Sequence, residues 1–372
     1  MPLTSLDIRG FRSLRSVSLK LGPLNVVTGP NGSGKSNLYR ALWLIARIAD
    51  GDFAQSICRE GGMFSALWAG PRMQPNKPVR MTFGFRIEDF GFELSCGYPP
   101  LDSTRFGSDP EIKEETVWFG REKKPSTTLL SRKGCMTTVR DMEGNRVEFP
   151  QTLDPNESVL AQLREPHRYP ELSTLREEMR GWRFYHQFRT DEGSPLRSPR
   201  SSVTTPVLSH DGSDLAAALM TIESSDNGEP LHAAVEAAFP GRKLQIISND
   251  EKPGSRTPRA TEFAVALETE GCARLLEARE LSDGTLKYLC LVASLLSPRP
   301  PALIALNEPE ASLHPDLLRP LAELIVNASK RSQIWVSTHS PVLVQAIEEL
   351  SEVSAIRLQL DNGETVVQVN DD

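Results

Sequence analysis

Apolar and polar residues alternate at the start of the chain, over residues 3–8 and again over residues 17–21. This period of two predicts two strands, each with one buried face. A short β-branched run at 24–28 follows and leads into a glycine-rich turn. Beyond the turn, helical spacing of apolar residues predicts a helix of about 14 residues through Leu38, Leu42, Ile45 and Ile48. The chain therefore opens with strands, a glycine loop and a helix.

The pattern changes between about residues 71 and 150, where short alternating segments are separated by glycine, proline and aspartate. They predict an antiparallel β region with strands at 79–85, 92–96, 127–131, 136–139 and 146–149. Residues 158–181 have a helical pattern that is broken near Pro166 and Pro170. Serine, proline, arginine and glycine dominate residues 192–206, which we predict to be a mobile loop or linker.

Helices and strands alternate again in the last part of the chain. Helices are expected at 213–222, 230–239 and 287–296, and strands at 244–248 and 261–267. Continuous apolar runs at 302–306 and 333–337 are typical of strands in a parallel sheet that is covered on both faces. Residues 355–369 predict a terminal hairpin around Asp361-Asn362-Gly363.

These patterns predict an α/β fold with a mixed central sheet, an antiparallel β subdomain and a helical insertion. We expect residues 1–75 and 207–372 to form the core and residues 76–206 to be the β-rich and helical insertion. The sequence has no internal repeat and no heptad run long enough for a coiled-coil arm.

Composition narrows the class of protein. The 372 residues are 39% hydrophobic and 24% charged, with a net charge of -7, so a DNA contact would need a local basic patch. The five cysteines form no C-x-x-C pair, which disfavours a zinc site or a disulfide framework and fits a reducing cytoplasm. No signal peptide and no apolar run of about 18 residues is present, so we expect a cytoplasmic protein without a membrane partner.

The glycine turn carries the clearest chemistry. Residues 29–36 match the phosphate-binding pattern G-x-x-x-x-G-K-[ST] without a gap, between a predicted strand and a predicted helix. Its backbone N–H groups would wrap a β-phosphate, Lys35 would reach the β- and γ-phosphates, and Ser36 would be a ligand of Mg²⁺. We therefore predict binding of ATP and Mg²⁺ through Gly29, Asn31, Gly32, Ser33, Gly34, Lys35, Ser36 and Asn37.

An acidic segment follows the apolar run at 302–306. In phosphate-loop ATPases a buried strand ends in an acid that holds Mg²⁺, and the next acid orients the attacking water. Glu308 fits the second role, whereas Asn307 stands where an aspartate is usual. The amide lacks a full negative charge, which leaves weaker Mg²⁺ binding, slower turnover or compensation by a neighbouring acid as alternatives.

Two further segments gain meaning from their order in the chain. His339 follows the apolar run at 333–337, where a histidine can reach a γ-phosphate. Ser282 and Gly284 precede a predicted helix, whose N-terminus is able to bind phosphate. In isolation, an ordinary N-cap is the favoured interpretation of Ser282.

The order phosphate loop, Leu-Ser-x-Gly, strand-Glu and strand-His resembles the ATPase heads of ABC type, especially the RecF/SMC/OLD-like branch. The resemblance covers the whole chain and is strongest in residues 29–37, 282–289, 308–315 and 337–341. It implies a P-loop NTPase fold and a homodimer that sandwiches two ATP molecules. Ser282 and Gly284 of one subunit would face the γ-phosphate held by Lys35 of the other, with Glu308 as general base and His339 as γ-phosphate sensor. The family's D-loop would correspond to residues 312–314, and its Q-loop glutamine has only a weak candidate in Gln74.

Two departures limit the resemblance. The chain has neither a coiled-coil arm nor a C-x-x-C hook, so a long SMC-type tether is not expected. Only about 30 residues follow His339, which leaves no room for the nuclease domain of OLD proteins. A nuclease or other effector would then be a separate chain.

Three functions fit the sequence. The first is an ATP-driven dimeric switch that acts on DNA or on a DNA-acting partner, in DNA repair or anti-phage defence. Basic residues able to meet phosphate, or simply to form a solvated surface, are Arg121, Lys123, Lys124, Arg132, Lys133, Arg189, Arg197 and Arg200. The second is a pseudo-ATPase that dimerises on ATP with little hydrolysis, suggested by Asn307. The third is the nucleotide-binding subunit of a transporter, which the β-rich insertion disfavours.

Overall fold

The computed structural model describes residues 1–71, 78–100, 106–149, 153–201, 203–248 and 262–368. The chain divides into two compact units. The first unit comprises residues 1–182 together with the C-terminal residues from 356 onward, and the second comprises residues 183–355. Each unit is described by itself. The predicted division into a core and an insertion at 76–206 stays a prediction.

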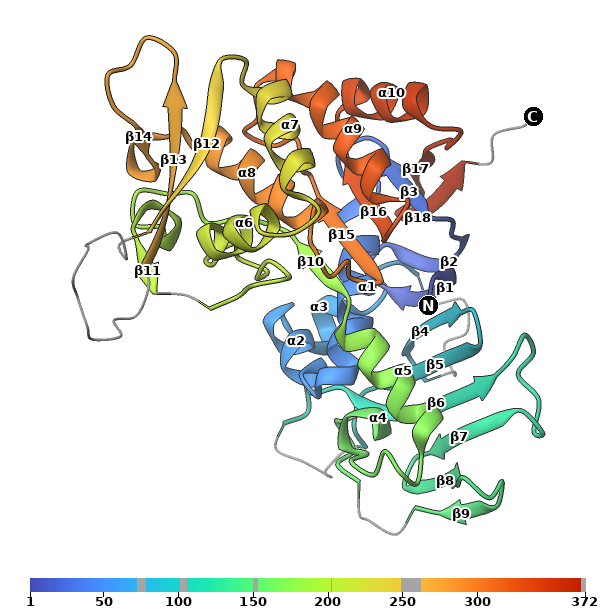
Figure 1. Ribbon diagram of the computed structural model, residues 1–372. Coiled ribbons are helices and arrows are strands. Elements are labelled where there is room, and N and C mark those ends of the chain that lie inside the picture. The colour runs from blue at the N-terminus through green and yellow to red at the C-terminus, as the bar shows by residue number, and fades with distance from the viewer. Residues whose placement is uncertain (72–77, 101–105, 150–152, 202, 249–261, 369–372) are drawn as a thin grey trace. The chain divides into compact units, whose positions relative to one another are not determined.

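An eight-stranded antiparallel sheet dominates the first unit, in the order β2-β1-β4-β5-β6-β7-β8-β9 (Figure 1). Its strands are β1 (Leu3–Phe11), β2 (Leu14–Lys20), β4 (Arg80–Ile87), β5 (Phe90–Gly97), β6 (Glu111–Phe119), β7 (Thr128–Lys133), β8 (Met136–Arg140) and β9 (Arg146–Glu148). Seven of these strands confirm predicted alternating segments. The exception, β6, was missed because Glu115 is fully buried in it and breaks the apolar–polar alternation.

Helices cover one face of this sheet. They are α1 (Lys35–Asp50), α2 (Phe53–Arg59), α3 (Gly62–Ala66), α4 (Val159–Gln162) and α5 (Pro170–Arg180). Buried aromatic rings join the two layers: Phe53 packs edge-on against Phe83 at 5.8 Å, and Trp182 packs edge-on against Phe85 at 5.5 Å. The core of this unit therefore lies on one side of the sheet, and the other face of the sheet is polar.

The phosphate loop lies between β3 (Leu24–Thr28) and α1. Strand β3 pairs in parallel with β17 (Ile356–Asp361), which forms an antiparallel hairpin with β18 (Glu364–Gln368). Asn362 and Gly363 both have positive φ angles, 48° and 83°, as a two-residue type I′ turn requires. The terminal hairpin predicted around Asp361-Asn362-Gly363 is therefore confirmed.

The second unit contains three parallel strands, β10 (Arg183–Tyr185), β15 (Leu303–Asn307) and β16 (Gln333–Thr338). Every residue of β15 and β16 is buried, which confirms the prediction of parallel strands covered on both faces. A smaller antiparallel sheet consists of β11 (Arg200–Ser201), β12 (Arg242–Ser248), β13 (Glu262–Thr269) and β14 (Leu276–Glu277). The helices are α6 (Leu215–Glu223), α7 (Gly228–Ala238), α8 (Asp283–Leu295), α9 (Leu318–Ala328) and α10 (Pro341–Leu350).

The segment predicted to be a mobile linker, residues 192–206, contains two short elements in its described part. A 3-10 helix spans Pro195–Arg197, and β11 pairs with β13. The composition of this segment is typical of loops, but hydrogen bonds from a single arginine, described below, hold it in place.

None of the helices in the described part of the chain has the length and apolar content that crossing a membrane requires.

Candidate active site

The phosphate loop is tightly enclosed within the first unit. A side chain at Gly34, which has a φ of 102°, would place its Cβ 2.0 Å from Oγ1 of Thr365. At Gly29 a Cβ would lie 2.3 Å from the carbonyl oxygen of Leu358. Both neighbouring atoms belong to the terminal hairpin, and both distances are shorter than any non-bonded approach allows. These two glycines are therefore required by the neighbouring hairpin, independently of any ligand.

Lys35 begins α1 and is 6% exposed. Its ammonium group donates to the carbonyl oxygens of Gly29 at 2.6 Å and Pro30 at 3.0 Å, so it lies over the loop that it is predicted to serve. The hydroxyl of Ser33 is buried and has no hydrogen-bond partner among the described residues. A buried polar atom without a partner is unfavourable, and a phosphate oxygen would satisfy it. This loop therefore fits a polyphosphate.

A network of hydrogen bonds joins Asn37, Ser13 and Thr365 next to the phosphate loop. The amide of Asn37 donates to the hydroxyl of Ser13 at 2.8 Å, and that hydroxyl bonds to Oγ1 of Thr365 at 2.7 Å. The backbone N–H of Thr365 donates to the carbonyl of Ser13 at 2.8 Å. Asn37 was predicted to contact nucleotide; in the structure its side chain belongs to this network, and a contact with nucleotide stays a prediction.

The second unit presents the acidic strand end. Asn307 is the last residue of β15 and is 8% exposed, and its amide oxygen has no hydrogen-bond partner among the described residues. An amide oxygen is a suitable ligand for Mg²⁺ or for its bound water. Because this oxygen is buried and unsatisfied, Asn307 fits the predicted metal position despite its missing charge.

Glu308 follows in a left-handed conformation, with a φ of 47°, while its backbone N–H still pairs with the carbonyl of Ser337 at 2.7 Å. Such a φ is uncommon for a residue with a side chain and is found at functional sites more often than elsewhere. The His339 ring nitrogen Nδ1 lies 3.8 Å from the Glu308 carboxylate. The structure thus brings together the predicted general base and the predicted γ-phosphate sensor.

Glu310 accepts hydrogen bonds from the segment that carries His339. Its Oε1 accepts hydrogen bonds from the hydroxyl of Thr338 at 2.6 Å and from the backbone N–H of His339 at 3.1 Å. The same oxygen lies 3.6 Å from Nδ1 of His339. The Glu310 side chain is 7% exposed, and its second oxygen has no partner among the described residues. A buried carboxylate therefore fixes the start of the segment that carries the histidine.

Lys287 connects α8 to the same strand end. Its ammonium group donates to the carbonyl oxygens of Glu308 at 3.2 Å and Ala311 at 2.7 Å. Burial lowers the pKa of Lys287, while the nearby carboxylates of Glu310 and Glu308 act in the opposite direction. The helix after Ser282 and the segment after β15 are thus tied together by one cation.

Ser282 is the N-cap of α8. Its hydroxyl accepts from the backbone N–H of Thr285 at 3.2 Å, which is the ordinary capping bond. A Cβ at Gly284 would lie 2.7 Å from the carbonyl oxygen of Ser312, so the residues after the acidic strand end approach this turn closely. Ser312 itself has a φ of 64°. A role of Ser282 and Gly284 toward nucleotide stays a prediction.

Arg197 holds this turn in place. Its guanidinium donates to the carbonyl oxygens of Ala278 and Leu281 and to the carboxylate of Asp283. On its other side it donates to the carbonyl of Thr190. With its side chain 12% exposed and every edge engaged, Arg197 is not available to a DNA phosphate, which corrects one of the predicted basic contacts.

The predicted residues fall into two groups. Gly29, Asn31, Gly32, Ser33, Gly34, Lys35, Ser36 and Asn37 belong to the first unit, and Ser282, Gly284, Asn307, Glu308 and His339 to the second. Within the second unit the structure brings together the Ser282 turn, the acidic strand end and the histidine. Gln74, the weak Q-loop candidate, lies outside the described residues.

Comparison with known proteins decides the family. Residues 24–345 match the family described as "AAA domain, putative AbiEii toxin, Type IV TA system", which is most of the chain. The chain belongs to this family. Within it, the chain is an ATPase of ABC type in the RecF/SMC/OLD branch. Nucleotide binding and hydrolysis are general properties of such ATPases.

Curated relatives match over short stretches. The chain is 51% identical over 47 residues to the DNA replication and repair protein RecF of Magnetococcus marinus. It is 44% identical over 43 residues to the OLD nuclease of Thermus scotoductus, and 35% identical over 103 residues to the chromosome partition protein Smc of Desulfitobacterium hafniense. These matches cover 12%, 12% and 27% of this chain. The chain spans only 12%, 8% and 8% of these relatives' lengths.

Solved structures support the fold across the whole chain. An Smc head domain with an extended coiled coil, bound to the C-terminal domain of ScpA derived from Pyrococcus furiosus, matches with a TM-score of 0.55 and 14% identity. The match covers 99% of this chain and 96% of the other. An SmcHead bound to the C-winged helix domain of ScpA matches with a TM-score of 0.53, 15% identity and coverage of 99% and 98%. The fold is therefore that of an ABC-type ATPase head.

For this ATPase, sequence reasoning missed the structural roles of four residues that shape the site. Glu310 had a signal, because it is a second acid two residues after Glu308 at the end of a buried strand. Lys287, Arg197 and Thr365 had none: each lies far in sequence from the group that it contacts, and only folding brings them together.

Proposed function

We propose that this chain is an ATP-driven switch that closes into a homodimer around ATP and acts on DNA or on a DNA-acting partner. DNA repair is the setting that the name of one relative suggests, and defence against phage is the alternative setting predicted from the sequence. A separate effector or nuclease chain would be its partner, and the cytoplasm its location. The observation that carries the proposal is the strand end of the second unit, where a strained Glu308 lies beside His339 next to an unsatisfied amide oxygen of Asn307.

Each residue has a role in this proposal. Lys35 would exchange its bonds to the loop carbonyls for the β- and γ-phosphates, and the Ser33 hydroxyl would gain the partner that it lacks. Ser36 and Asn307 would hold Mg²⁺, which neutralises negative charge on the phosphates. Glu308 would accept a proton from the attacking water, and His339 would donate a hydrogen bond to the γ-phosphate.

Dimerisation would complete the site. The Ser282 turn of one subunit would face the phosphate loop of the other, as the resemblance to ABC-type heads implies. Three internal interactions support a turn built for this purpose: Arg197 fixes Asp283, Lys287 ties α8 to the strand end, and the Ser312 carbonyl approaches Gly284 closely. A shaped, braced turn loses less conformational entropy on binding a partner subunit than a loose one.

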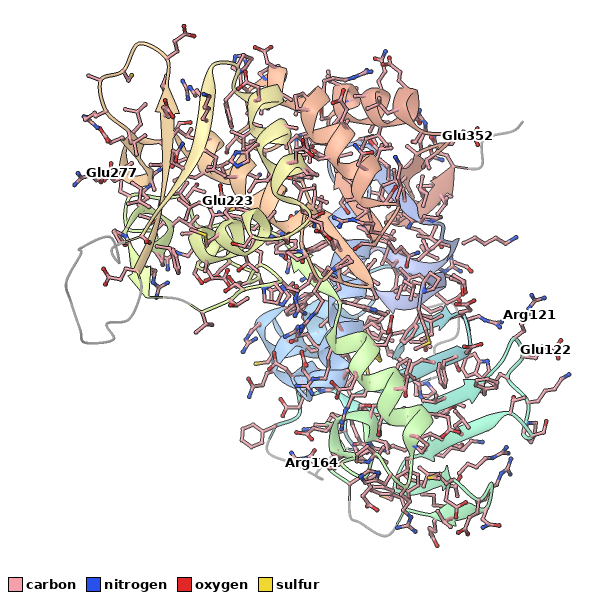
Figure 2. All side chains as sticks on the ribbon, viewed as in Figure 1. Arg121, Glu122, Arg164, Glu223, Glu277 and Glu352 are labelled. Carbon is pink, nitrogen blue, oxygen red and sulfur yellow. The ribbon has the colours of Figure 1, made fainter. Side chains whose placement is uncertain are left out.

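The experiment compares wild type with Glu308→Gln for ATP turnover and for molecular mass by light scattering, with and without duplex DNA. We expect the variant to lose turnover and to accumulate as an ATP-bound dimer. A matched control is Glu352→Gln, since Glu352 is an exposed carboxylate on the surface of the second unit (Figure 2). A wild type that stays monomeric with ATP would contradict the proposal.

A pseudo-ATPase is the second candidate, and Asn307 is the observation that favours it. Without a carboxylate at this position, Mg²⁺ would be held more weakly and ATP would serve mainly to close the dimer. ATP-dependent dimerisation of the wild type without measurable turnover would select this function over the first.

A further inference from the structure

The polar face of the eight-stranded sheet carries a hollow over β6, β7 and β8. Its volume is about 460 Å³. Five cationic side chains line it: Lys123, Lys124, Lys133, Arg140 and Arg146. We call this feature the basic hollow. Such a concentration of positive charge stands out in a chain whose net charge is -7.

Carboxylates neutralise only part of this charge. Lys123 pairs with Glu93 at 2.7 Å, and Lys124 pairs with Glu122. These pairs are exposed, so each contributes little and yields readily to another anion. Glu114, the carboxylate that lines the hollow, pairs with Arg80 at 2.7 Å, a residue outside the hollow.

The remaining three cations have no ion pair in the described part of the chain. Lys133 is exposed at the end of β7, and Nε of Arg140 is buried without a hydrogen-bond partner among the described residues. Arg146 donates to the carbonyl of Pro125, which carries no charge. These three cations therefore have no ion-pair partner among the described residues, although Glu114 is the cross-strand partner of Lys133 and Glu148 is that of Thr138.

Two of these cations stand directly opposite each other. Arg140 of β8 is the cross-strand partner of Arg146 of β9. Like charges at directly opposed positions of an antiparallel pair are destabilising. The nearest acid in the turn, Asp141, uses Oδ1 to accept from the backbone N–H groups of Glu143 and Asn145. An anion from outside the chain would relieve the repulsion between the two guanidinium groups.

Neutral donors lie between the cations. Thr116 of β6 is opposite Ser131 of β7, which in turn is opposite Thr138 of β8, so three hydroxyl groups cross the sheet in one row. All three line the basic hollow. Hydroxyls flanked by lysine and arginine are the groups with which proteins contact the phosphates and sugars of DNA.

We propose that the basic hollow binds the phosphate backbone of duplex DNA. This inference rests on the proposed function, in which the ATPase acts on DNA, and it assigns DNA binding to the outer face of β6–β8. The cations and hydroxyls of the basic hollow would contact phosphates and sugars and no base edges. We therefore expect binding to be independent of the DNA sequence. Arg132, which the sequence placed among the candidate phosphate ligands, is excluded: it is 3% exposed and donates to the carbonyls of Glu157 and Asp154.

The test measures binding of the full chain to a fluorescent duplex of about 30 base pairs, roughly three helical turns, by anisotropy. The variant carries Lys133→Gln, Arg140→Gln and Arg146→Gln. We expect affinity to fall about tenfold or more, equally for unrelated sequences. The slope of log K against log salt should become shallower by roughly 0.9 for each phosphate that the variant no longer neutralises, about 2.7 for all three, between about 50 and 200 mM salt.

Two controls separate this binding site from general charge and from misfolding. The first removes three exposed cations near the helical layer, with Arg59→Gln, Arg164→Gln and Arg168→Gln; Figure 2 shows Arg164 beside α4, away from Arg121 and Glu122 at the β6–β7 turn. It should bind DNA like the wild type. The second, Lys133→Arg with Arg140→Lys and Arg146→Lys, preserves charge and should retain most of the affinity.

The outcomes distinguish this inference from the proposed function. ATP turnover and ATP-dependent dimerisation, measured without DNA, should be unchanged in the triple glutamine variant. Wild-type affinity in that variant would overturn the inference while leaving the ATP switch intact. Absence of DNA binding by the wild type would overturn it as well, as would tighter binding to vesicles of anionic phosphatidylserine than to DNA.

Discussion

Thr365 occupies the space in which Gly34 of the phosphate loop would carry a side chain: a Cβ there would lie 2.0 Å from the threonine Oγ1. The two residues are at opposite ends of the chain, and their close approach locks the terminal hairpin onto the loop. Thr365 is 1% exposed and bonds to Ser13 through both its hydroxyl and its backbone N–H. The loop is thus shaped by the C-terminus of the first unit before any ligand arrives.

Replacing Thr365 should therefore weaken ATP binding. Thr365→Ala removes the hydroxyl that bonds to Ser13, a bond of about 1 kcal/mol, so we expect roughly fivefold weaker ATP binding by isothermal titration. Thr365→Ser keeps the hydroxyl and should bind nearly as well as the wild type. Equal affinities for Ala and wild type would show that the hairpin does not shape the loop.

Arg197 should govern dimerisation rather than nucleotide binding. Arg197→Gln leaves the carbonyl oxygens around the Ser282 turn without their charged donor, and we expect ATP-dependent dimerisation to weaken at least about tenfold, or about 1.4 kcal/mol. Binding of ATP to the monomer should be unchanged. Arg189→Gln, which removes an exposed charge from the same segment, is the control. Sedimentation with and without ATP measures both variants, and equal dimerisation would refute the role.

Glu310 should set the rate of hydrolysis through the histidine segment. Glu310→Ala leaves the Thr338 hydroxyl and the His339 N–H without an acceptor, at a cost of about 1–3 kcal/mol to stability. We expect ATP turnover to fall about tenfold or more while ATP still binds. Glu310→Gln retains an acceptor oxygen and should keep more activity. Turnover that is unaffected by Ala would remove Glu310 from the site.

Asn307→Asp tests whether the missing charge limits the enzyme. An aspartate at the unsatisfied position should bind Mg²⁺ more tightly, because charge-assisted hydrogen bonds and ion contacts are about twice as strong as neutral ones. A gain of about 1 kcal/mol would lower the Mg²⁺ concentration for half-maximal turnover about fivefold. Asn327→Asp adds the same charge on the surface of α9 and should change nothing. An unchanged Mg²⁺ requirement in Asn307→Asp would argue against a metal ligand.

The buried carboxyl of Glu115 should make the free energy of unfolding depend on pH. Burial raises the pKa of this carboxyl above 4.5, although Ser158 and Val159 donate to it and Arg132 is its cross-strand partner. Because the pKa is higher in the folded state than the ordinary value of 4.5, the carboxyl contributes stability that is fully present below pH 4.5. This stability is lost as the pH rises through the folded-state pKa. Glu115→Gln mimics the protonated form, so its stability relative to wild type should increase with pH in urea unfolding. A relative decrease would show that the carboxyl is ionised in the fold.

Local sequence determines many of the strands and turns of this fold. The period of two in β1 and β2, the apolar runs of β15 and β16, and the turn at Asn362-Gly363 each follow from interactions within a few residues. The phosphate-loop motif is local for the same reason, because consecutive backbone N–H groups shape it. Hence the α/β class and the family were predictable from the chain alone, and the candidate ATP site stays a prediction from the same local motif.

Other features depend on residues that meet only after folding. Strand β6 was not predicted because its buried Glu115 becomes acceptable only when Ser158 and Val159, from another part of the chain, supply donors. Arg197 was taken for a surface cation, because nothing in a segment rich in serine, proline and arginine indicates that its guanidinium donates to the carbonyl oxygens of residues 278 and 281. The placement of Arg140 opposite Arg146 depends on the register of β8 and β9, which the sequence alone does not reveal.

The sequence by itself determined the candidate chemistry that we predict: a phosphate loop, a strand-end glutamate and a following histidine, all encoded in short motifs. Only the tertiary structure decided what holds these groups: Thr365 against Gly34, Glu310 beneath His339, and Arg197 around the Ser282 turn. The physical reason is the range of the interactions. Backbone conformation and periodic burial are set by neighbours in sequence, whereas a buried polar side chain is stable only where distant parts of the chain provide its partners.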